Sequence, residues 1–257
     1  MGKRLENKGI IVVGAGTMGE GLGNGKAAAL QFGREGARVL CVDLNASAAE
    51  DTRNMIREEG GSAECCKADV TCADDCRGVI ETFFKYYKKL DVLHNNVGIG
   101  GGKEILDITE EIWDTLFRVN AKGMFLMCKA AIPTMIEGGG GSIINVSSIA
   151  SIRPLPDVAY VASKGAVDSL TMYIARRYGR YNIRANVLML GYIDTPLASP
   201  AWVSDKVRQI NLRQVPMRRF ASPTEVATAA SFLASDDSSY VNGVILKVDG
   251  GLSICLS

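Results

Sequence analysis

The chain has 257 residues, of which 47% are hydrophobic and 22% are charged, and its formal net charge is +1. This balance is typical of one globular domain with an ample core, and it includes no basic block or acidic tail that would indicate binding to nucleic acid or a membrane surface. No stretch approaches the roughly 18 apolar residues of a membrane span, and the first apolar run ends too early, at Gly14, for a signal peptide. We therefore expect a cytoplasmic protein.

The cysteines and the single histidine argue against a metal centre. The seven cysteines include no CxxC pair, and we expect reduced, mostly buried thiols. His94 lies within the apolar run 91–95, where a satisfied histidine on a strand is the better interpretation. One histidine excludes a multi-histidine zinc site, and a Ser-His-Asp triad would have to use this buried position. We expect no metal.

Apolar runs alternate with helical patterns along the chain. The predicted strands are 8–13, 38–42, 65–68, 91–95, 142–146, 184–190 and 244–248. The predicted helices are 27–34, 46–59, 73–87, 110–136 and 157–178, followed by one that opens at the capping box Ser222-Pro223-Thr224-Glu225. Continuously apolar strands separated by helices are typical of a parallel sheet covered on both faces. The pattern predicts a single doubly wound α/β domain of the Rossmann type over residues 1–257.

One long excursion, at 192–220, follows the strand at 184–190. A long connection after the carboxyl end of a strand is a typical place for a lid over a ligand site. We expect the arginines late in this excursion, Arg208, Arg213, Arg218 and Arg219, to be solvated. The predicted wall of the substrate pocket is apolar: Ile193, Leu197, Trp202 and Val203, with Ile99 and Ile149.

A glycine-rich segment follows the first strand directly. Its start, Gly14-Ala15-Gly16-Thr17-Met18-Gly19, fits the dinucleotide-binding fingerprint GxGxxG. Further glycines at 21, 23 and 25 each cost roughly 1 kcal/mol relative to alanine in a helix, so we expect the helix to begin only around residues 23–25. The long loop would bring backbone N–H groups and the helix dipole to a pyrophosphate. Which glycines make that contact stays open.

Asp43 ends the second predicted strand. An acidic residue at this position hydrogen-bonds the adenosine ribose hydroxyls, and its charge repels a 2′-phosphate, so NAD is favoured over NADP. The alternative is that Asp43 only caps the following helix. Asn45 serves that purpose better.

Tyr160 and Lys164 are four residues apart on the predicted helix 157–178. This spacing places both side chains on one face of the helix. A nearby ammonium favours the phenolate, so we predict a lowered Tyr160 pKa and proton transfer to or from a carbonyl or alcohol oxygen. Ser147 and Ser148 follow the apolar run 143–146, at the carboxyl end of a strand, where open α/β sheets bind ligands. Ser148 stands 12 residues before Tyr160 and Ser147 stands 13; both spacings are plausible, and Ser148 is preferred.

In combination these features resemble the short-chain dehydrogenase/reductase family over essentially the whole chain. The shared motifs are the Gly14 turn, Asp69-Val70, Asn95-Asn96-Val97-Gly98, Asn120 in Arg118-Val119-Asn120-Ala121, Ser147-Ser148, Tyr160 with Lys164, Gly191 with Ile193-Asp194-Thr195-Pro196, and Val248-Asp249-Gly250-Gly251. The resemblance implies a seven-stranded parallel sheet. It also implies a homotetramer, commonly paired through the two long helices, here 110–136 and 157–178, and the C-terminal segment.

The resemblance further implies a catalytic tetrad of Asn120, Ser148, Tyr160 and Lys164. Tyr160 would be the acid/base, Ser148 would hydrogen-bond the substrate oxygen, and Lys164 would hold the nicotinamide ribose. Asn120 would kink its helix and hold a water that links Lys164 to solvent. The implied cofactor contacts are Gly14, Thr17, Gly23, Asn24, Asp43, Leu44, Asp69, Val70, Asn96, Gly98, Tyr160, Lys164, Ile193 and Thr195.

Three positions depart from the family pattern. Val13 stands where threonine is usual, Val97 replaces an alanine and Leu190 replaces a proline. The leading hypothesis is an NAD-dependent alcohol dehydrogenase or ketone reductase for a small or medium, mostly uncharged substrate. One alternative is an NADPH-dependent 3-oxoacyl-carrier-protein reductase, against which Asp43 argues. Another is a non-catalytic NAD-binding scaffold, against which the intact Asn-Ser-Tyr-Lys set argues.

Overall fold

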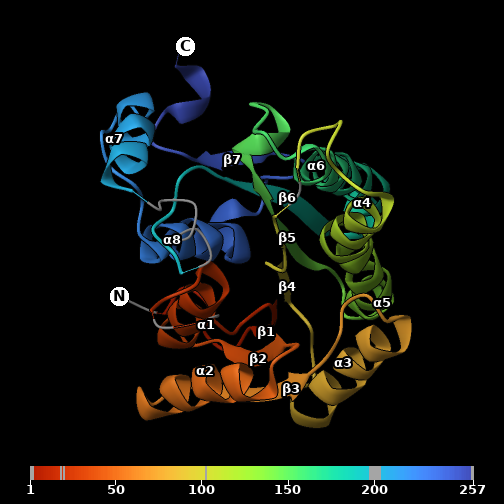
Figure 1. Ribbon diagram of the computed structural model, residues 1–257. Coiled ribbons are helices and arrows are strands. Elements are labelled where there is room, and N and C mark those ends of the chain that lie inside the picture. The colour runs from red at the N-terminus through yellow and green to blue at the C-terminus, as the bar shows by residue number, and fades with distance from the viewer. Residues whose placement is uncertain (1–2, 18, 20, 102, 197–203, 256–257) are drawn as a thin grey trace.

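The computed structural model describes residues 3–17, 19, 21–101, 103–196 and 204–255. Among them, seven strands form one sheet in the order β3-β2-β1-β4-β5-β6-β7, and every neighbouring pair is parallel (Figure 1). The strands are β1 Gly9–Val13, β2 Arg38–Asp43, β3 Ser62–Lys67, β4 Val92–Asn95, β5 Gly141–Ser148, β6 Ile183–Leu190 and β7 Ile245–Val248. The strand order reverses at β1 and β4, which is where open α/β sheets place their ligands.

Helices cover both faces of this sheet, as the continuously apolar strands predict. The helices are α1 Asn24–Arg34, α2 Ala46–Glu58, α3 Ala73–Tyr86, α4 Glu110–Phe117, α5 Gly123–Glu137, α6 Val158–Tyr178, α7 Asp205–Gln214 and α8 Pro223–Ala234. Figure 1 shows α1, α2 and α8 on one side of the sheet and α3 to α6 on the other. The predicted fold class, a single doubly wound Rossmann-type domain, is confirmed.

The core has one layer on each side of the sheet. Alternate residues of β1 supply both layers: Ile11 and Val13 pack toward α3 and α5, whereas Ile10 and Val12 pack toward α1 and α8. All four side chains are at most 1% exposed. The sheet therefore holds the loops at its carboxyl edge on a rigid base.

One predicted helix is interrupted, and one further helix was not predicted. The expected continuous helix 110–136 is interrupted by a π-helix, Arg118–Lys122, between α4 and α5. The excursion after β6 contains a helix, α7, that the sequence analysis did not anticipate; Ser204 caps it by accepting a hydrogen bond from the Val207 N–H at 3.3 Å.

The third strand also begins earlier than predicted, at Ser62 rather than at 65. Pairing with β2 places Arg38 opposite Ser62, so the backbone ladder extends into residues that are not apolar. β3 is an edge strand, and three of its residues are only half-buried. An edge position removes the need for a continuous apolar run, which was the signal used to find the strand.

Candidate active site

The glycine-rich loop packs tightly against the start of α1. Gly14 has φ +78°, in the left-handed region that favours glycine, where the chain leaves β1. A Cβ added to Gly25 would stand 1.9 Å from the Gly14 carbonyl oxygen, so only glycine permits this approach. α1 begins at Asn24 after the cap residue Gly23, as the glycine spacing predicts. The loop thus brings backbone N–H groups to the N-terminus of α1.

Two polar side chains of this loop differ in how they are paired. The Thr17 hydroxyl accepts a hydrogen bond from the Gly23 N–H at 3.0 Å, which fixes the loop against the cap of α1. Asn24 is half-buried, and its Oδ1 atom is buried without a hydrogen-bond partner. A buried acceptor of this kind costs free energy unless a donor reaches it.

Asp43 faces the glycine loop from the end of β2. Its Oδ2 accepts a hydrogen bond from the Gly16 N–H at 2.9 Å and its Oδ1 accepts one from the Asn45 N–H at 3.0 Å. Asn45, not Asp43, is the cap of α2, because its side chain accepts from the Ala48 N–H. Each carboxylate oxygen keeps a second lone pair for a ligand hydroxyl. The neighbouring Leu44 side chain is 62% exposed.

The predicted contacts after β3 and β4 lie along the same edge of the sheet. Asp69 fixes its own turn, with Oδ1 accepting from the Thr71 N–H at 2.8 Å. Val70 is buried against α5. The Asn96 side chain donates to the Gly14 carbonyl at 3.4 Å, which ties the end of β4 to the glycine loop.

The two serines at the end of β5 have different surroundings. The Ser148 hydroxyl lies beside the Tyr160 hydroxyl and lowers the pKa of that phenol, and it accepts a hydrogen bond from the Ala150 N–H at 3.2 Å. Ser147 is only 2% exposed, and its hydroxyl donates to the backbone carbonyl of Lys164 at 3.4 Å. Adjacent residues of a strand point to opposite faces, so only one of the two can face a substrate. The geometry favours Ser148.

Lys164 is buried beside Tyr160. The side chain is 3% exposed, its Nζ donates to the Val146 carbonyl at 3.1 Å, and Nζ lies 5.7 Å from the centre of the Tyr160 ring. Gly98 gives this ammonium its room, because an added Cβ would stand 2.9 Å from Nζ. Tyr160, Lys164, Ser148 and the end of β4 therefore meet at one place.

Asn120 sits in the π-helix and is fully buried. Its side chain spans to the loop after β4: Oδ1 accepts from the Ile99 N–H at 2.8 Å, and Nδ2 donates to the Ile99 carbonyl at 2.9 Å. Nδ2 also donates to the Ser163 hydroxyl of α6 at 3.0 Å. Single π-turns are frequent at functional sites. This one fastens the β4 loop to the helix that carries Tyr160.

The structure overturns one electrostatic prediction. Burial raises the pKa of Tyr160 above its ordinary value, although the Ser148 hydrogen bond partly opposes the rise. Burial also lowers the pKa of Lys164 to about 8, against which the charge of Asp168 acts. The ammonium donates to a carbonyl rather than to the phenol, and the predicted lowering of the Tyr160 pKa by Lys164 is wrong, because desolvation decides its direction.

The excursion after β6 departs from the predicted pocket wall. Ile193 and Ile149 are 5% and 2% exposed and belong to the core, so their side chains do not form an apolar wall. Ile99 is half-buried, and Thr195 is buried near the β6 end. The predicted wall residues Leu197, Trp202 and Val203 lie outside the described residues.

Arg208 of α7 is not simply solvated, contrary to the prediction. Its guanidinium lies 3.4 Å from Asp194 Oδ2 and 4.8 Å from the centre of the Phe220 ring. The Phe220 ring in turn packs edge-on against Tyr192, with ring centres 5.6 Å apart. These contacts link α7 to both ends of the excursion.

One residue that the sequence analysis used only as a helix boundary contributes to the site. Asp157 caps α6: Oδ1 accepts from the Tyr160 N–H at 3.0 Å and Oδ2 accepts from the Gly101 N–H at 3.2 Å. It thereby joins the β4 loop to the first turn of the helix that carries Tyr160. An aspartate three residues before that tyrosine was the available signal.

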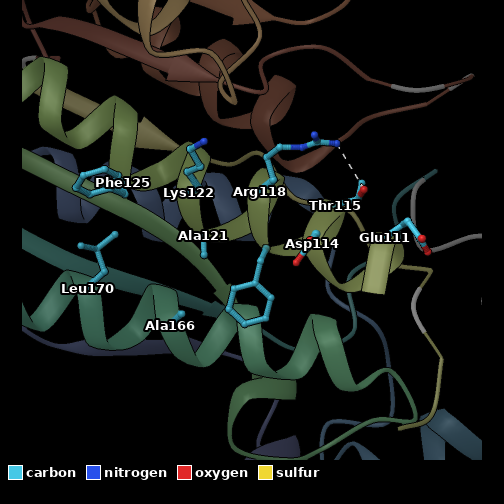
Figure 2. Close-up of a pocket in the computed structure, with 10 residues that line it drawn as sticks. Glu111, Asp114, Thr115, Arg118, Ala121, Lys122, Phe125, Ala166 and Leu170 are labelled. Carbon is cyan, nitrogen blue, oxygen red and sulfur yellow. Dashed lines mark hydrogen bonds between the residues drawn. The ribbon is translucent and has the colours of Figure 1, made fainter. Parts of the chain in front are cut away.

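A cavity of about 820 Å³ lies elsewhere, on the outer surface of α4, α5 and α6 (Figure 2). Side chains from all three helices line it, including Phe117 and Phe125, the latter 44% exposed. Ala166 and Leu170 form its floor on α6. None of the predicted site residues lines this cavity.

Within the described ranges, no group of three or more His, Cys, Asp and Glu side chains is arranged to hold a metal ion. No helix in the same ranges is long and apolar enough to cross a membrane. All seven cysteines are free thiols, and three of them, Cys41, Cys76 and Cys128, are buried.

Comparison with known proteins identifies the family. Residues 20–253 match the family model described as Enoyl-(Acyl carrier protein) reductase. The 3-oxoacyl-[acyl-carrier-protein] reductase of Thermotoga maritima is 38% identical, over 98% of this chain and 100% of that protein. The chain belongs to the short-chain dehydrogenase/reductase family. It is an oxidoreductase.

Solved structures of short-chain dehydrogenases/reductases have the same fold. One from Burkholderia xenovorans is 33% identical with a TM-score of 0.94, covering 99% of this chain and 100% of that one. A gluconate 5-dehydrogenase from Burkholderia cenocepacia, in complex with NADP and tartrate, is 32% identical with a TM-score of 0.92, covering 99% of each chain. The names of these relatives differ in substrate, so family membership alone leaves the substrate open.

The family's nicotinamide cofactor fits the residues present. The Oδ1 atom of Asn24 is a buried acceptor without a partner at the N-terminus of α1. A Cβ on Gly16 would stand 2.8 Å from Asp43 Oδ2, and one on Gly98 would stand 2.9 Å from Lys164 Nζ. Gly16 and Gly98 thus leave space beside Asp43 and Lys164, and Asn24 Oδ1 is free to accept a hydrogen bond from a ligand.

Proposed function

We propose that this short-chain dehydrogenase/reductase interconverts a secondary alcohol and a ketone with NAD(H). The observation that carries the proposal is the contact between the Tyr160 and Ser148 hydroxyls beside the buried ammonium of Lys164, at the carboxyl edge of the sheet. A hydroxyl donor pair aimed at one place suits a carbonyl oxygen, which becomes an alcohol oxygen as the reaction proceeds.

In the proposed mechanism Tyr160 is the general acid in reduction and the general base in oxidation. The raised Tyr160 pKa keeps the phenol protonated, which is the form that gives a proton to a ketone oxygen. Ser148 hydrogen-bonds the same oxygen and holds it in line with the phenol. When bound, the nicotinamide supplies or accepts the hydride. Lys164 turns from the Val146 carbonyl toward the nicotinamide ribose and the phenol, and Asn120 maintains the loop at Ile99.

We propose that the cofactor is NAD rather than NADP, because Asp43 places a carboxylate beside Gly16 where a 2′-phosphate would have to lie. The exposed Leu44 and the buried Val70 offer apolar contacts for the adenine on either side. The NADP complex of the gluconate 5-dehydrogenase concerns that protein, and Asp43 is the reason we do not transfer its cofactor. The full set of cofactor contacts that we propose is Gly14, Thr17, Gly23, Asn24, Asp43, Leu44, Asp69, Val70, Asn96, Gly98, Tyr160, Lys164, Ile193 and Thr195.

The test is absorbance at 340 nm with NADH and NADPH separately, against a panel of cyclic and aryl ketones and diketones. Oxidation of NADH by one class of ketone supports the proposal. Tyr160→Phe is expected to lower kcat by about 10²- to 10⁴-fold, the usual range for a general acid, while NADH still binds. Retention of full turnover by this variant would remove Tyr160 from the mechanism.

A second candidate is an NADPH-dependent 3-oxoacyl-carrier-protein reductase. The specific observation in its favour is the 38% identity with the Thermotoga maritima enzyme of that name. Preference for NADPH together with reduction of a 3-oxoacyl thioester would establish this candidate instead. A non-catalytic NAD-binding scaffold is the third; tight NADH binding without turnover across the panel would support it.

We propose that the chain acts on a small alcohol or ketone and assembles with further copies of itself. We also propose that it is located in the cytoplasm. The cavity of Figure 2 joins an apolar band on α5 and α6 to charged residues of α4, which suits a surface covered in a homotetramer. Replacing Leu170 by Glu is expected to shift the sedimentation coefficient to a smaller species. The excursion 192–220 is the proposed substrate lid, with Arg208 as its attachment to Asp194.

A further inference from the structure

We propose that Asp168 is a positioning residue of this site: a buried countercharge that keeps Lys164 protonated and fastens the end of β5 to α6. The inference rests on the proposed function of Lys164. Asp168 is 6% exposed, and its Oδ1 atom is buried without a hydrogen-bond partner. A buried ionised carboxyl group lowers the stability of the fold unless an opposite charge or hydrogen-bond donors compensate it.

The helical spacing directs Asp168 toward the site. It follows Lys164 by four residues, so at 3.6 residues per turn the two side chains point within about 40° of each other. Ala166 and Leu170, which line the outer cavity of Figure 2, point about 160° away from Asp168 by the same count. Asp168 therefore belongs to the inner face of α6, one turn behind the ammonium, and not to the outer surface.

Two serine hydroxyls lie beside the carboxyl and can serve it. Ser147 of β5 and Ser151 of the 3-10 turn after β5 both lower the pKa of Asp168, which burial raises. In the structure each hydroxyl is directed at a carbonyl: Ser147 at Lys164 and Ser151 at Ser148, at 3.4 and 3.0 Å. A hydroxyl has one proton and rotates. Both hydroxyls can turn to an ionised Asp168, which then holds Ser147, directly before Ser148, and Ser151, three residues after it.

The charged group that acts on Asp168 is Lys164, whose positive charge lowers the pKa of the carboxyl. β5 and the 3-10 turn present the hydroxyls of Ser147 and Ser151 to the carboxyl. β6 also packs on α6, and its one charged residue, Arg184, donates to the Leu233 and Ser235 carbonyls. Four charged residues of α4 and the π-helix line the outer cavity: Glu111, Asp114, Arg118 and Lys122. The fifth, Glu110, is exposed in the first turn of α4. An ionised Asp168 raises the pKa of Lys164, so its loss lets the ammonium deprotonate at a lower pH.

The experiment compares pH profiles of kcat/KM for the full-length wild type, Asp168→Asn and the control Asp51→Asn. Asp51 is exposed on α2, far along the sheet from Lys164. Asp168→Asn is expected to move the alkaline limb down by about one pH unit, the lower end of the effect of a neighbouring opposite charge. Its activity at pH 8 to 9 then falls about tenfold, and at pH 6.5 it stays within about twofold of the wild type. Asp51→Asn should follow the wild type throughout.

A uniform loss of activity at every pH, or superimposable profiles, would overturn the proposal, because a purely structural carboxyl does not move one limb. Ser151→Ala covers the case in which Asp168→Asn does not fold. This variant removes a donor from the ionised carboxyl, so the acid limb moves to higher pH while the alkaline limb stays. NADH fluorescence titrations across the same pH range provide the readout if no ketone is turned over. A wild type without turnover counts against the proposed function, whereas unshifted NADH affinity profiles count against Asp168.

Discussion

Replacing Asp43 by Asn tests the choice of cofactor with the smallest change in shape. The carboxylate keeps lone pairs for ribose hydroxyls, and a hydrogen bond to a charged acceptor contributes about 1.5 to 3 kcal/mol. At 1.4 kcal/mol per factor of ten, losing the charge lowers NADH affinity by about 10- to 100-fold. A 2′-phosphate about 5 Å from the carboxylate meets a repulsion of about 3 kcal/mol at an effective dielectric constant of 20. Relief of that repulsion raises NADPH affinity by about 100-fold.

The assay is a fluorescence titration of each variant with NADH and with NADPH, and the quantity compared is the ratio of the two dissociation constants. Asp43→Asn also places an amide beside the Gly16 N–H, which can disturb the loop. Asn45→Ala is the matched control, because it removes the cap of α2 two residues away and leaves the Asp43 charge in place. The control is expected to lose about 1 kcal/mol of stability with an unchanged ratio. A wild type that prefers NADPH, or an Asp43→Asn ratio equal to that of the wild type, would refute the reasoning.

Three further predictions concern buried positions. Gly25→Ala forces the start of α1 away from Gly14, so it should lower the free energy of unfolding by about 1 to 3 kcal/mol and weaken NADH binding. The control Gly78→Ala, on an open part of α3, should raise the free energy of unfolding by up to about 1 kcal/mol in the same urea titration. Lys164→Met should stabilise the cofactor-free protein at pH 7, because the folded pKa of about 8 lies below the ordinary 10.5. The gain in unfolding free energy over the wild type is about 3 kcal/mol, and it should shrink as pH rises from 8 to 10.5. Burial lowers the pKa of the lone His94 to about 4, so its imidazole should stay neutral in an NMR titration down to pH 5. The unfolded chain takes up this proton first, so the free energy of unfolding should decrease as pH falls from 6.5 through 4.

The fold could be predicted from the sequence because its signals are local and repeated. Continuous apolar runs identified six strands closely, and the glycine spacing placed the start of α1 near Asn24. β3 was misplaced at its first residues because an edge strand needs no apolar run. α7 was missed because its sequence, DKVRQINLRQ, is mostly polar, and its link to the fold through Arg208 depends on residues distant in sequence.

The site could be predicted only as a set of residues. The order of motifs named Tyr160, Lys164 and Ser148 as candidates, and the structure places them beside one another, yet the predicted direction of the Tyr160 pKa was wrong. A spacing of four residues tells which side chains share a face, and it carries no information on burial. The desolvation of both groups, and the carbonyl that holds the ammonium, come from β5 and from the loop after β4, which the helix sequence does not contain.

Three unfavourable buried groups lie where the ligands are proposed to bind, whereas Glu35, His94 and Ser231 each have an unpaired buried atom elsewhere in the described residues. Asn24 has an unpaired buried acceptor at the glycine loop, Lys164 is a buried ammonium, and Asp168 is a buried carboxyl one turn behind it. The two layers that cover the sheet are mostly apolar. Titratable groups with strongly shifted pKa values gather at functional sites, so the buried Lys164 and Asp168 at this edge support the proposed site. The same argument makes Asp168 a better candidate than His94, since the imidazole is equally buried but lies within β4 against Phe32, where it serves packing.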